Sequence, residues 1–154
     1  MSATLTNWDL RFLDLASLIA TWSKDRSTKV GAVIVGPHRE IRSTGYNGFP
    51  PRVDDDQDSR HERPTKYLFT SHAEENAIAF AALNGVALQG CTMYSSMFPC
   101  ATCARLIIRA GIKRIVAPEG NRADWQEQHE AARIMFQEAS VSVHERLLDH
   151  VSAG

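Results

Sequence analysis

Two cysteines three positions apart, Cys100 and Cys103, are the residues of this chain whose types and spacing most clearly suggest chemistry. They lie in the segment MFPCATCARLIIRAG, directly after Pro99. A Cys-x-x-Cys pair alone fits half of a structural zinc site, a redox pair or chance. The redox interpretation expects a thioredoxin-like βαβ context, and the structural-zinc interpretation requires a second pair of Cys or His ligands. The third cysteine, Cys91, begins an apolar strand and is expected to be a small core residue.

A histidine upstream of the pair is the best candidate for a further ligand. His72 occurs in SHAEENAIAFAA at the predicted start of a helix, with Glu74 two residues later. His-x-Glu followed by Pro-Cys-x-x-Cys is the signature of zinc deaminases. The remaining histidines stand in polar or terminal surroundings, and we expect them to be solvated; they are His38, His61, His129, His144 and His150.

The chemistry of zinc explains why these residue types should meet. Two thiolates and one imidazole fill three tetrahedral positions and leave the fourth for water. Bound zinc lowers the pKa of water from about 15.7 to about 7. Glu74 is too close to His72 to be a comfortable fourth ligand, so we expect it to carry protons to the ring nitrogen and the leaving amine. As first-turn acids, Glu74 and Glu75 would also complement the helix dipole, which is the simpler interpretation of Glu75.

Apolar periodicity and turn signals predict the element order αββαβαβαβ. This order is typical of a layered α/β domain with helices over a mixed sheet, and the absence of an interdomain linker predicts a single domain over residues 1–154. Residues 47–71 lack periodicity and are expected to be a long polar loop of the kind that is often functional. The predicted helices cover 7–23, 72–84, 99–111 and 125–139, and the predicted strands cover 29–36, 40–46, 91–97, 112–118 and 140–147.

Composition disfavours two classes of partner. The chain has 154 residues, 17 basic and 18 acidic, for a net charge of −1. Nucleic-acid and membrane surfaces usually need a basic excess. The segment MSATLTNWDLRFLD lacks the pattern of a signal peptide, and no apolar run reaches the roughly 18 residues of a membrane span. We therefore expect a cytoplasmic protein without a membrane partner.

Several longer stretches resemble the deoxycytidylate (dCMP) deaminase family of the cytidine-deaminase-like superfamily. They are WSKDRSTKVGAVIV, GYNGFPPRVDDD, the segment from TKYLFTSHAEENAI to RAGIKRIV and, more loosely, EAARIMFQEASV; together they cover most of residues 22–141. The resemblance implies a three-layer αβα fold with a central mixed five-stranded sheet and zinc-dependent conversion of dCMP to dUMP, a dTTP precursor. It also implies an assembly that is often hexameric, activation by dCTP, inhibition by dTTP, and Mg²⁺ accompanying a nucleotide effector.

The resemblance assigns roles to further residues beside the zinc ligands and Glu74. Asn47, in GYNGFP, is similar to the asparagine that binds the sugar hydroxyls, although Asn-Gly is also a turn sequence. The backbone of Ala73 and the ring of Phe98 are expected to line the base pocket. Phe98 also fits the simpler role of an apolar residue at the end of a strand.

Two departures from the family pattern concern recognition of the phosphate. Arg26 stands where the family usually has proline after Ser-Lys-Asp, and EGNRADW lacks the tyrosine that usually lies near the phosphate. Guanidinium and ammonium groups both bind phosphate, so Arg122, Arg26 and Lys24 are the candidates to replace it. Each of the three also fits the description of an ordinary surface cation.

Other functions remain open from the sequence. The substrate could be dCTP, a 5-substituted dCMP, a free nucleoside or another amino-heterocycle. A tRNA adenosine deaminase would use the same metal motif, but the chain lacks the basic surplus of a tRNA-binding surface. A non-catalytic nucleotide-binding module would keep the zinc for folding, yet such a module has little need for Glu74.

Overall fold

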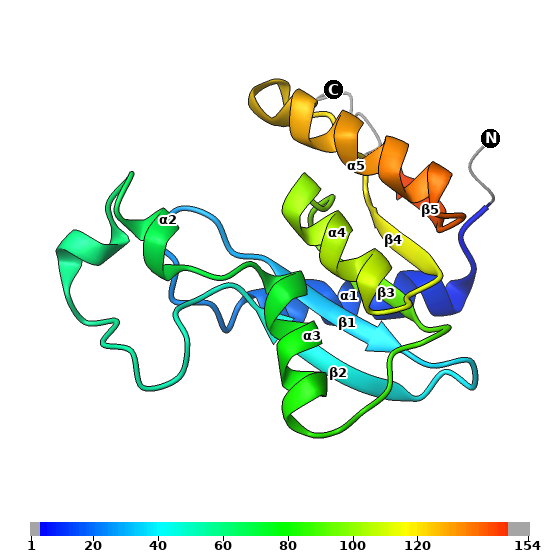
Figure 1. Cartoon of the computed structure of the whole chain (residues 1–154), viewed down its shortest axis with the longest axis horizontal. Coiled ribbons are helices and arrows are strands. Elements are labelled where there is room, and N and C mark those ends of the chain that lie inside the picture. Colours follow the sequence, from blue (N-terminus) through cyan, green and yellow to red (C-terminus); the bar gives the residue numbers. More distant parts are fainter. Residues whose placement is uncertain (1–3, 148–154) are drawn as a thin grey trace, which may run out of the picture.

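A five-stranded sheet forms the centre of the molecule, in a computed structural model that describes residues 4–147. The strand order is β2-β1-β3-β4-β5 (Figure 1). Strand β1 pairs antiparallel with β2 and β3, while β3, β4 and β5 run parallel, so the predicted mixed sheet is confirmed. The strands are β1 (Gly31–Val35), β2 (Ile41–Tyr46), β3 (Thr92–Ser95), β4 (Arg114–Pro118) and β5 (Ser142–Arg146).

Helices cover both faces of the sheet and give the three predicted layers (Figure 1). Val33 and Val35 of β1 belong to the core beneath α1, whereas Ala32 and Ile34 belong to the core on the opposite face. Every residue of β1 is buried, as expected for a strand that is covered on both sides. The helices are α1 (Asn7–Ala20) on one face and α3 (Ala73–Leu83), α4 (Ala101–Arg109) and α5 (Gln126–Glu138) on the other.

The segment between β2 and α3 differs from the expected irregular loop. It contains a 3-10 turn, η1 (Asp58–His61), and a four-residue helix, α2 (Lys66–Phe69). A helix of one turn is too short to produce a 3.6-residue apolar period, so the sequence pattern could not reveal it. A second 3-10 turn, η2 (Ala123–Trp125), precedes α5. The other predicted elements are present, with most ends one to three residues inside the predicted bounds.

A close approach between β2 and α3 fixes the beginning of that helix. A Cβ atom on Gly45 would lie 2.5 Å from the carbonyl oxygen of Ala73 and 2.5 Å from the amide nitrogen of Ala77. The hydroxyl of Ser43 donates a hydrogen bond of 2.7 Å to the carbonyl of Ala77. Glycine at position 45 therefore lets the first turn of α3 lie directly on the sheet, which positions His72.

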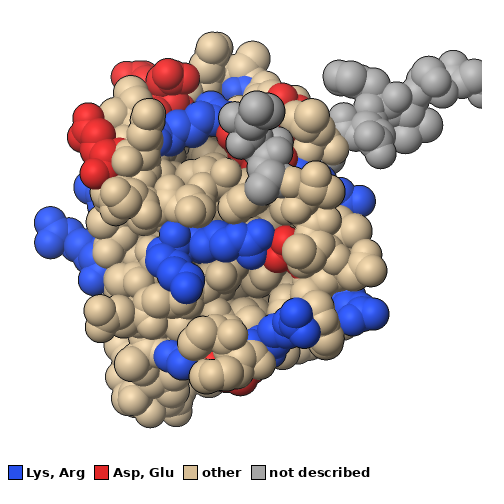
Figure 2. Space-filling view, turned by 90° about the vertical axis from the view of Figure 1, so that its right-hand side faces the viewer, with Lys and Arg blue, Asp and Glu red and all other residues tan. Residues whose placement is uncertain are grey.

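One face of the molecule carries mixed charge (Figure 2). On the face shown in Figure 2, Lys and Arg side chains are interspersed with uncharged residues and a few acidic ones. Among the helices within residues 4–147, none is long and apolar enough to cross a bilayer.

Candidate active site

The predicted ligand side chains meet where two helices begin. His72 is the N-cap residue of α3, and Cys100 is the N-cap residue of α4. The His72 Nδ1 atom lies 3.4 Å from Cys100 Sγ and 3.4 Å from Cys103 Sγ. Two helix N-termini thus converge on one point, and their dipoles favour thiolates there.

The ligand geometry fits a tetrahedral zinc ion. One atom each from His72, Cys100 and Cys103 can be chosen so that all three lie within 4.8 Å of one another. With Zn–S near 2.3 Å and Zn–N near 2.0 Å, the edge of a tetrahedron is roughly 3.5 Å, close to the observed 3.4 Å separations. Cys100 and Cys103 are buried, whereas His72 is partly exposed. Three ligands leave one position for water or substrate, as in catalytic zinc sites.

Contacts among the three ligand groups shift the pKa values of all three. The thiol of Cys103 and the ring of His72 hydrogen-bond to Cys100 and lower its pKa to about 4, against the opposing effect of burial. The hydrogen bond to Cys100 raises the pKa of His72 to about 9. The same Cys100 contact, together with burial, raises the pKa of Cys103 far above its usual range. Zinc binding would release the remaining protons, because its ligands must be deprotonated.

Glu74 lies beside the ligands but is held by different partners. Its Oε1 accepts a hydrogen bond of 2.7 Å from the Ser95 hydroxyl, and its Oε2 lies 3.4 Å from Cys103 Sγ. The side chain is buried, and burial raises the pKa of its carboxyl group while the Ser95 hydroxyl opposes the rise. Glu75 turns instead to the helix end, where its carboxylate accepts a hydrogen bond of 3.2 Å from the His72 amide.

A cavity of about 440 Å³ adjoins the ligands. Its wall includes His72, Glu74 and Cys100, together with the aromatic side chains of Phe98 and Trp125. Small-molecule sites typically enclose about 300–1,000 Å³ and combine aromatic walls with a few polar groups. The metal site therefore opens into a space with the size and lining of a small-molecule site.

The three residues predicted to contact the base and sugar all line this cavity. Ala73 and Phe98 are buried at its wall. The side-chain oxygen of Asn47 accepts a hydrogen bond of 2.8 Å from the Val30 amide, and its Nδ2 donates one of 2.8 Å to the Thr28 carbonyl. Asn47 thus holds the segment before β1 in place and keeps one donor and one acceptor for a ligand. Its predicted contact with sugar hydroxyls stays a prediction.

The candidate phosphate-binding cations lie in different places. Arg122 lines the cavity and forms an ion pair of 2.9 Å with Asp124. Lys24 and Arg26 are absent from the described lining of this cavity. At the surface, the Lys24 ammonium lies 2.9 Å from Asp55 and the Arg26 guanidinium lies 2.7 Å from Asp58. Each of these two charges is therefore already compensated outside the cavity.

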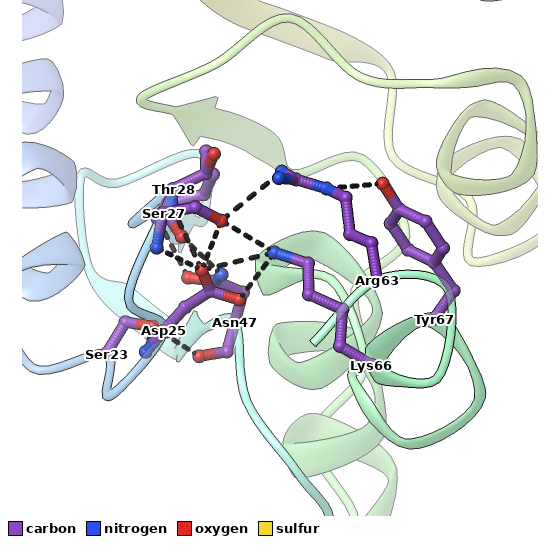
Figure 3. Close-up of polar contacts among 9 residues, drawn as sticks. Ser23, Asp25, Ser27, Thr28, Asn47, Arg63, Lys66 and Tyr67 are labelled. Atoms are coloured by element: carbon purple, nitrogen blue, oxygen red, sulfur yellow. Dashed lines mark hydrogen bonds and ion pairs between the residues drawn. The ribbon is translucent and has the colours of Figure 1, made fainter. Parts of the chain in front are cut away.

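Two cations that the sequence did not single out line the cavity instead. Arg63 precedes α2 and Lys66 begins it. Lys66 is 7% exposed, which is rare for a lysine unless it is paired. Its Nζ lies 3.2 Å from Asp25 Oδ2 and 2.8 Å from Ser27 Oγ (Figure 3).

Asp25 joins this lysine to the segment before β1. One of its carboxylate oxygens, Oδ1, accepts hydrogen bonds of 2.9 Å from both the Ser27 and the Thr28 amides. Burial opposes ionisation, but these two amides and Lys66 together lower the pKa of Asp25 to about 2. The ionised pair ties together two segments that both border the cavity (Figure 3).

This pair predicts a specific acid sensitivity. The pKa of Asp25 falls from 3.8 to about 2 on folding, so its stabilisation is fully present above about pH 4 and is lost as the pH falls toward 2. A shift of that size corresponds to roughly 2 kcal/mol. Urea unfolding at pH 5 and at pH 2 gives the loss of unfolding free energy over this range for the parent and for Asp25→Asn. The loss should be larger in the parent, by roughly the same 2 kcal/mol. Equal pH dependence in the two proteins would contradict this role.

The other histidines correct one expectation. His129 is 1% exposed rather than solvated, because it shares the buried face of α5 with Ala132 and Phe136. Its ring centre lies 5.3 Å from that of Phe98, behind the cavity wall, and burial lowers its pKa. His61 is also partly buried and stacks on Phe49, at 5.0 Å between ring centres. His150 lies outside the described residues.

Comparison with known proteins identifies a family whose zinc-binding region includes this site. The family described as the cytidine and deoxycytidylate deaminase zinc-binding region matches residues 6–119. A protein of Aliivibrio fischeri named as an uncharacterized deaminase in the luxG 3'region is 44% identical over 142 residues, which cover 90% of this chain and 93% of that protein. The deoxycytidylate deaminase of Mus musculus is 40% identical over 140 residues, covering 88% of this chain and 77% of that enzyme.

A solved structure shares the fold at lower sequence similarity. The dCMP deaminase of the cyanophage S-TIM5, solved in complex with dCMP and dUMP, has a TM-score of 0.76 and 22% identity, covering 94% of this chain and 100% of that chain. The family's zinc-binding region contains His72, Cys100 and Cys103, whose geometry fits the metal. The chain therefore belongs to the cytidine and deoxycytidylate deaminase family and is a zinc-dependent deaminase.

Proposed function

We propose that this protein hydrolyses dCMP to dUMP and ammonia. The observation that carries the proposal is the meeting, in one cavity beside the metal group, of the ligands His72 and Cys100, a buried glutamate and several cations. The metal end suits hydrolysis of an amino-heterocycle, and Arg63 and Arg122 on the wall suit a phosphate. Relatives named deoxycytidylate deaminase, at about 40% identity over most of the chain, support the same substrate.

The residues of the site divide the work of the reaction. Zinc, when bound, makes hydroxide available at neutral pH by lowering the pKa of water to about 7. Glu74 takes a proton from the attacking water and passes it to ring nitrogen N3 as the oxygen adds at C4. It then takes the proton of the new C4 hydroxyl and gives it to the amino group, which leaves as ammonia when the C4–N bond breaks. Ser95 fixes one Glu74 oxygen and leaves the other facing the ligands. Phe98 and Trp125 exclude water from the faces of the ring, and Asn47 contacts the sugar.

Ammonia release by the zinc-loaded protein tests the proposal. We expect dCMP to react at least tenfold faster than deoxycytidine at equal low concentration, because a charge-assisted contact to phosphate is worth about 1.5–3 kcal/mol. The panel should also contain CMP, dCTP, 5-methyl-dCMP and adenosine. Fast turnover of another member with dCMP inert would keep the deaminase chemistry and overturn the substrate. No turnover of any member would favour the binding-module alternative.

The tRNA alternative is less well supported by the surface. A tRNA substrate needs basic residues around the mouth of the cavity to hold phosphates beside the target base. The face that carries interspersed Lys and Arg side chains in Figure 2 lies on the side of the molecule opposite α2 in Figure 1. Lys66 and Tyr67 of α2 line the cavity. Around the cavity itself, Lys66 and Arg122 are paired with acidic residues.

We extend the proposal to regulation by dCTP and dTTP. The stretch GFPPRVDDD, which resembles the family's regulatory region, lines a second cavity of about 520 Å³. Its aspartates would supply the oxygen ligands that Mg²⁺ prefers beside a nucleotide. Asn47 and Asp25 border both cavities and could carry the coupling between them. Assembly as a homo-oligomer, hexameric by resemblance, belongs to the same proposal.

A further inference from the structure

One cation on the cavity wall lacks the acidic partner that the other two possess. Lys66 is paired with Asp25, and Arg122 is paired with Asp124. Arg63 has no carboxylate within ion-pair distance among residues 4–147; its hydrogen bonds run to the neutral hydroxyls of Tyr67 and Ser27. The cavity therefore contains one positive charge that the described part of the protein does not neutralise.

The guanidinium of Arg63 is held in place by contacts at both ends. Its Nε donates a hydrogen bond of 2.7 Å to the Tyr67 hydroxyl, one helical turn further on. Its Nη2 donates one of 3.3 Å to Ser27 Oγ, on the segment that the Asp25–Lys66 pair anchors. Figure 3 shows the Arg63 side chain reaching from the α2 region toward Ser27. A cation fixed in this way loses less conformational entropy when it binds a ligand.

The donors that remain free define the kind of ligand. An arginine has five N–H donors in a planar fork, and the two contacts to Tyr67 and Ser27 use two of them. The other three can bind an oxyanion in the bidentate manner that suits phosphate. Arg122 approaches the same cavity from the segment before α5, but it shares its charge with an exposed aspartate.

We propose that Arg63 determines specificity for the 5'-phosphate, so that the enzyme takes nucleoside 5'-monophosphates in preference to nucleosides. This inference rests on the proposed function and assigns the phosphate contact to a residue outside the metal motif. Arg63 takes the role for which Lys24 and Arg26 were candidates from the sequence, since the charges of those two are compensated outside the cavity. Arg63 is exposed at the cavity mouth, so its replacement should leave the fold intact.

Calorimetric titration of the zinc-loaded protein with dUMP and with 2'-deoxyuridine tests the assignment. Arg63→Gln should weaken dUMP binding about 10- to 100-fold and leave deoxyuridine binding unchanged, because only the phosphate contact is lost. Arg63→Lys should recover part of the loss, since it restores the charge but not the fork. The matched control is Arg60→Gln, which removes a guanidinium bonded to the Asp54 carbonyl outside the cavity lining. This control should bind dUMP as the parent does.

The outcomes separate this inference from the proposed reaction. Unchanged dUMP affinity in Arg63→Gln would overturn the assignment, and so would an equal loss for dUMP and deoxyuridine. A parent protein that binds dUMP no better than deoxyuridine would overturn it as well. If dUMP binding depends on Arg63 while dCMP is not deaminated, the phosphate contact stands and the proposed substrate fails. Tyr67→Phe, which removes the bond to Arg63 Nε, should weaken dUMP binding by a smaller factor in the same direction.

Discussion

Replacing Glu74 by glutamine should lower the turnover of the preferred substrate by about 10²- to 10⁴-fold while zinc stays bound. Glutamine keeps the shape of the side chain and can still accept the hydrogen bond from Ser95. It cannot take a proton from water or deliver one to the substrate ring at neutral pH. Since Glu74 is not among the three metal ligands, the zinc content should remain at one per chain. Steady-state ammonia release and metal analysis on the same preparation give both quantities.

The neighbouring glutamate provides the matched control. Glu75→Gln changes the same charge in the same helical turn, but this side chain bonds to the His72 amide and is absent from the described lining of the cavity. Its turnover should stay within a few-fold of the parent. Turnover of Glu74→Gln that equals the parent's would exclude the proton-transfer role, and loss of zinc in that variant would make its role structural.

Replacing Cys103 by serine should lower both zinc content and stability. Cys103 has no exposed surface and belongs to the main core. Serine is similar in volume to cysteine, but its hydroxyl binds zinc poorly. If free zinc stands at a thousand times its dissociation constant, bound metal adds about 4 kcal/mol to the free energy of unfolding. We expect most of that stabilisation to be lost in the variant. Denaturant unfolding with and without a chelator, together with metal analysis, measures the loss.

The third cysteine distinguishes loss of the metal from loss of core packing. Cys91 is equally buried in the same core cluster and lies outside the metal group. Cys91→Ser should be destabilised in its own right, because it buries a hydroxyl, yet it should keep its zinc and its response to the chelator. Full zinc occupancy in Cys103→Ser would refute the ligand set. Zinc loss in both variants would show that packing rather than ligation is responsible.

The metal site was predictable from sequence because its chemistry restricts both residue type and position. Each ligand segment begins a helix, with His72 and Cys100 as the N-cap residues of α3 and α4, although α4 begins two residues after the predicted start at Pro99. The sheet was predictable for a similar local reason, since β-branched runs such as the one in β1 end at turn residues.

The part of the cavity wall formed by Arg63 and Lys66 was not predictable from the sequence. Arg63 contacts Ser27, 36 positions away in the chain, and Lys66 contacts Asp25, 41 positions away. No local pattern records such a contact, and a one-turn helix leaves no period. His129 was misjudged because its polar neighbours in sequence point outward, whereas its neighbours three and seven positions along α5 face the core.

The bond between Asp25 and Lys66 also bears on how this chain can change in length. It joins residues 41 positions apart, and Asn47 is fixed to residues 28 and 30 within the same span. The stretch between Asn47 and Lys66 is thus a loop with both ends clamped. Because the entropy of closing a loop grows only with the logarithm of its length, residues could be gained or lost there at little thermodynamic cost. Residues 48–62 are absent from the described lining of the cavity at the metal site, so that cavity would keep its wall, Arg63 included, while those residues varied.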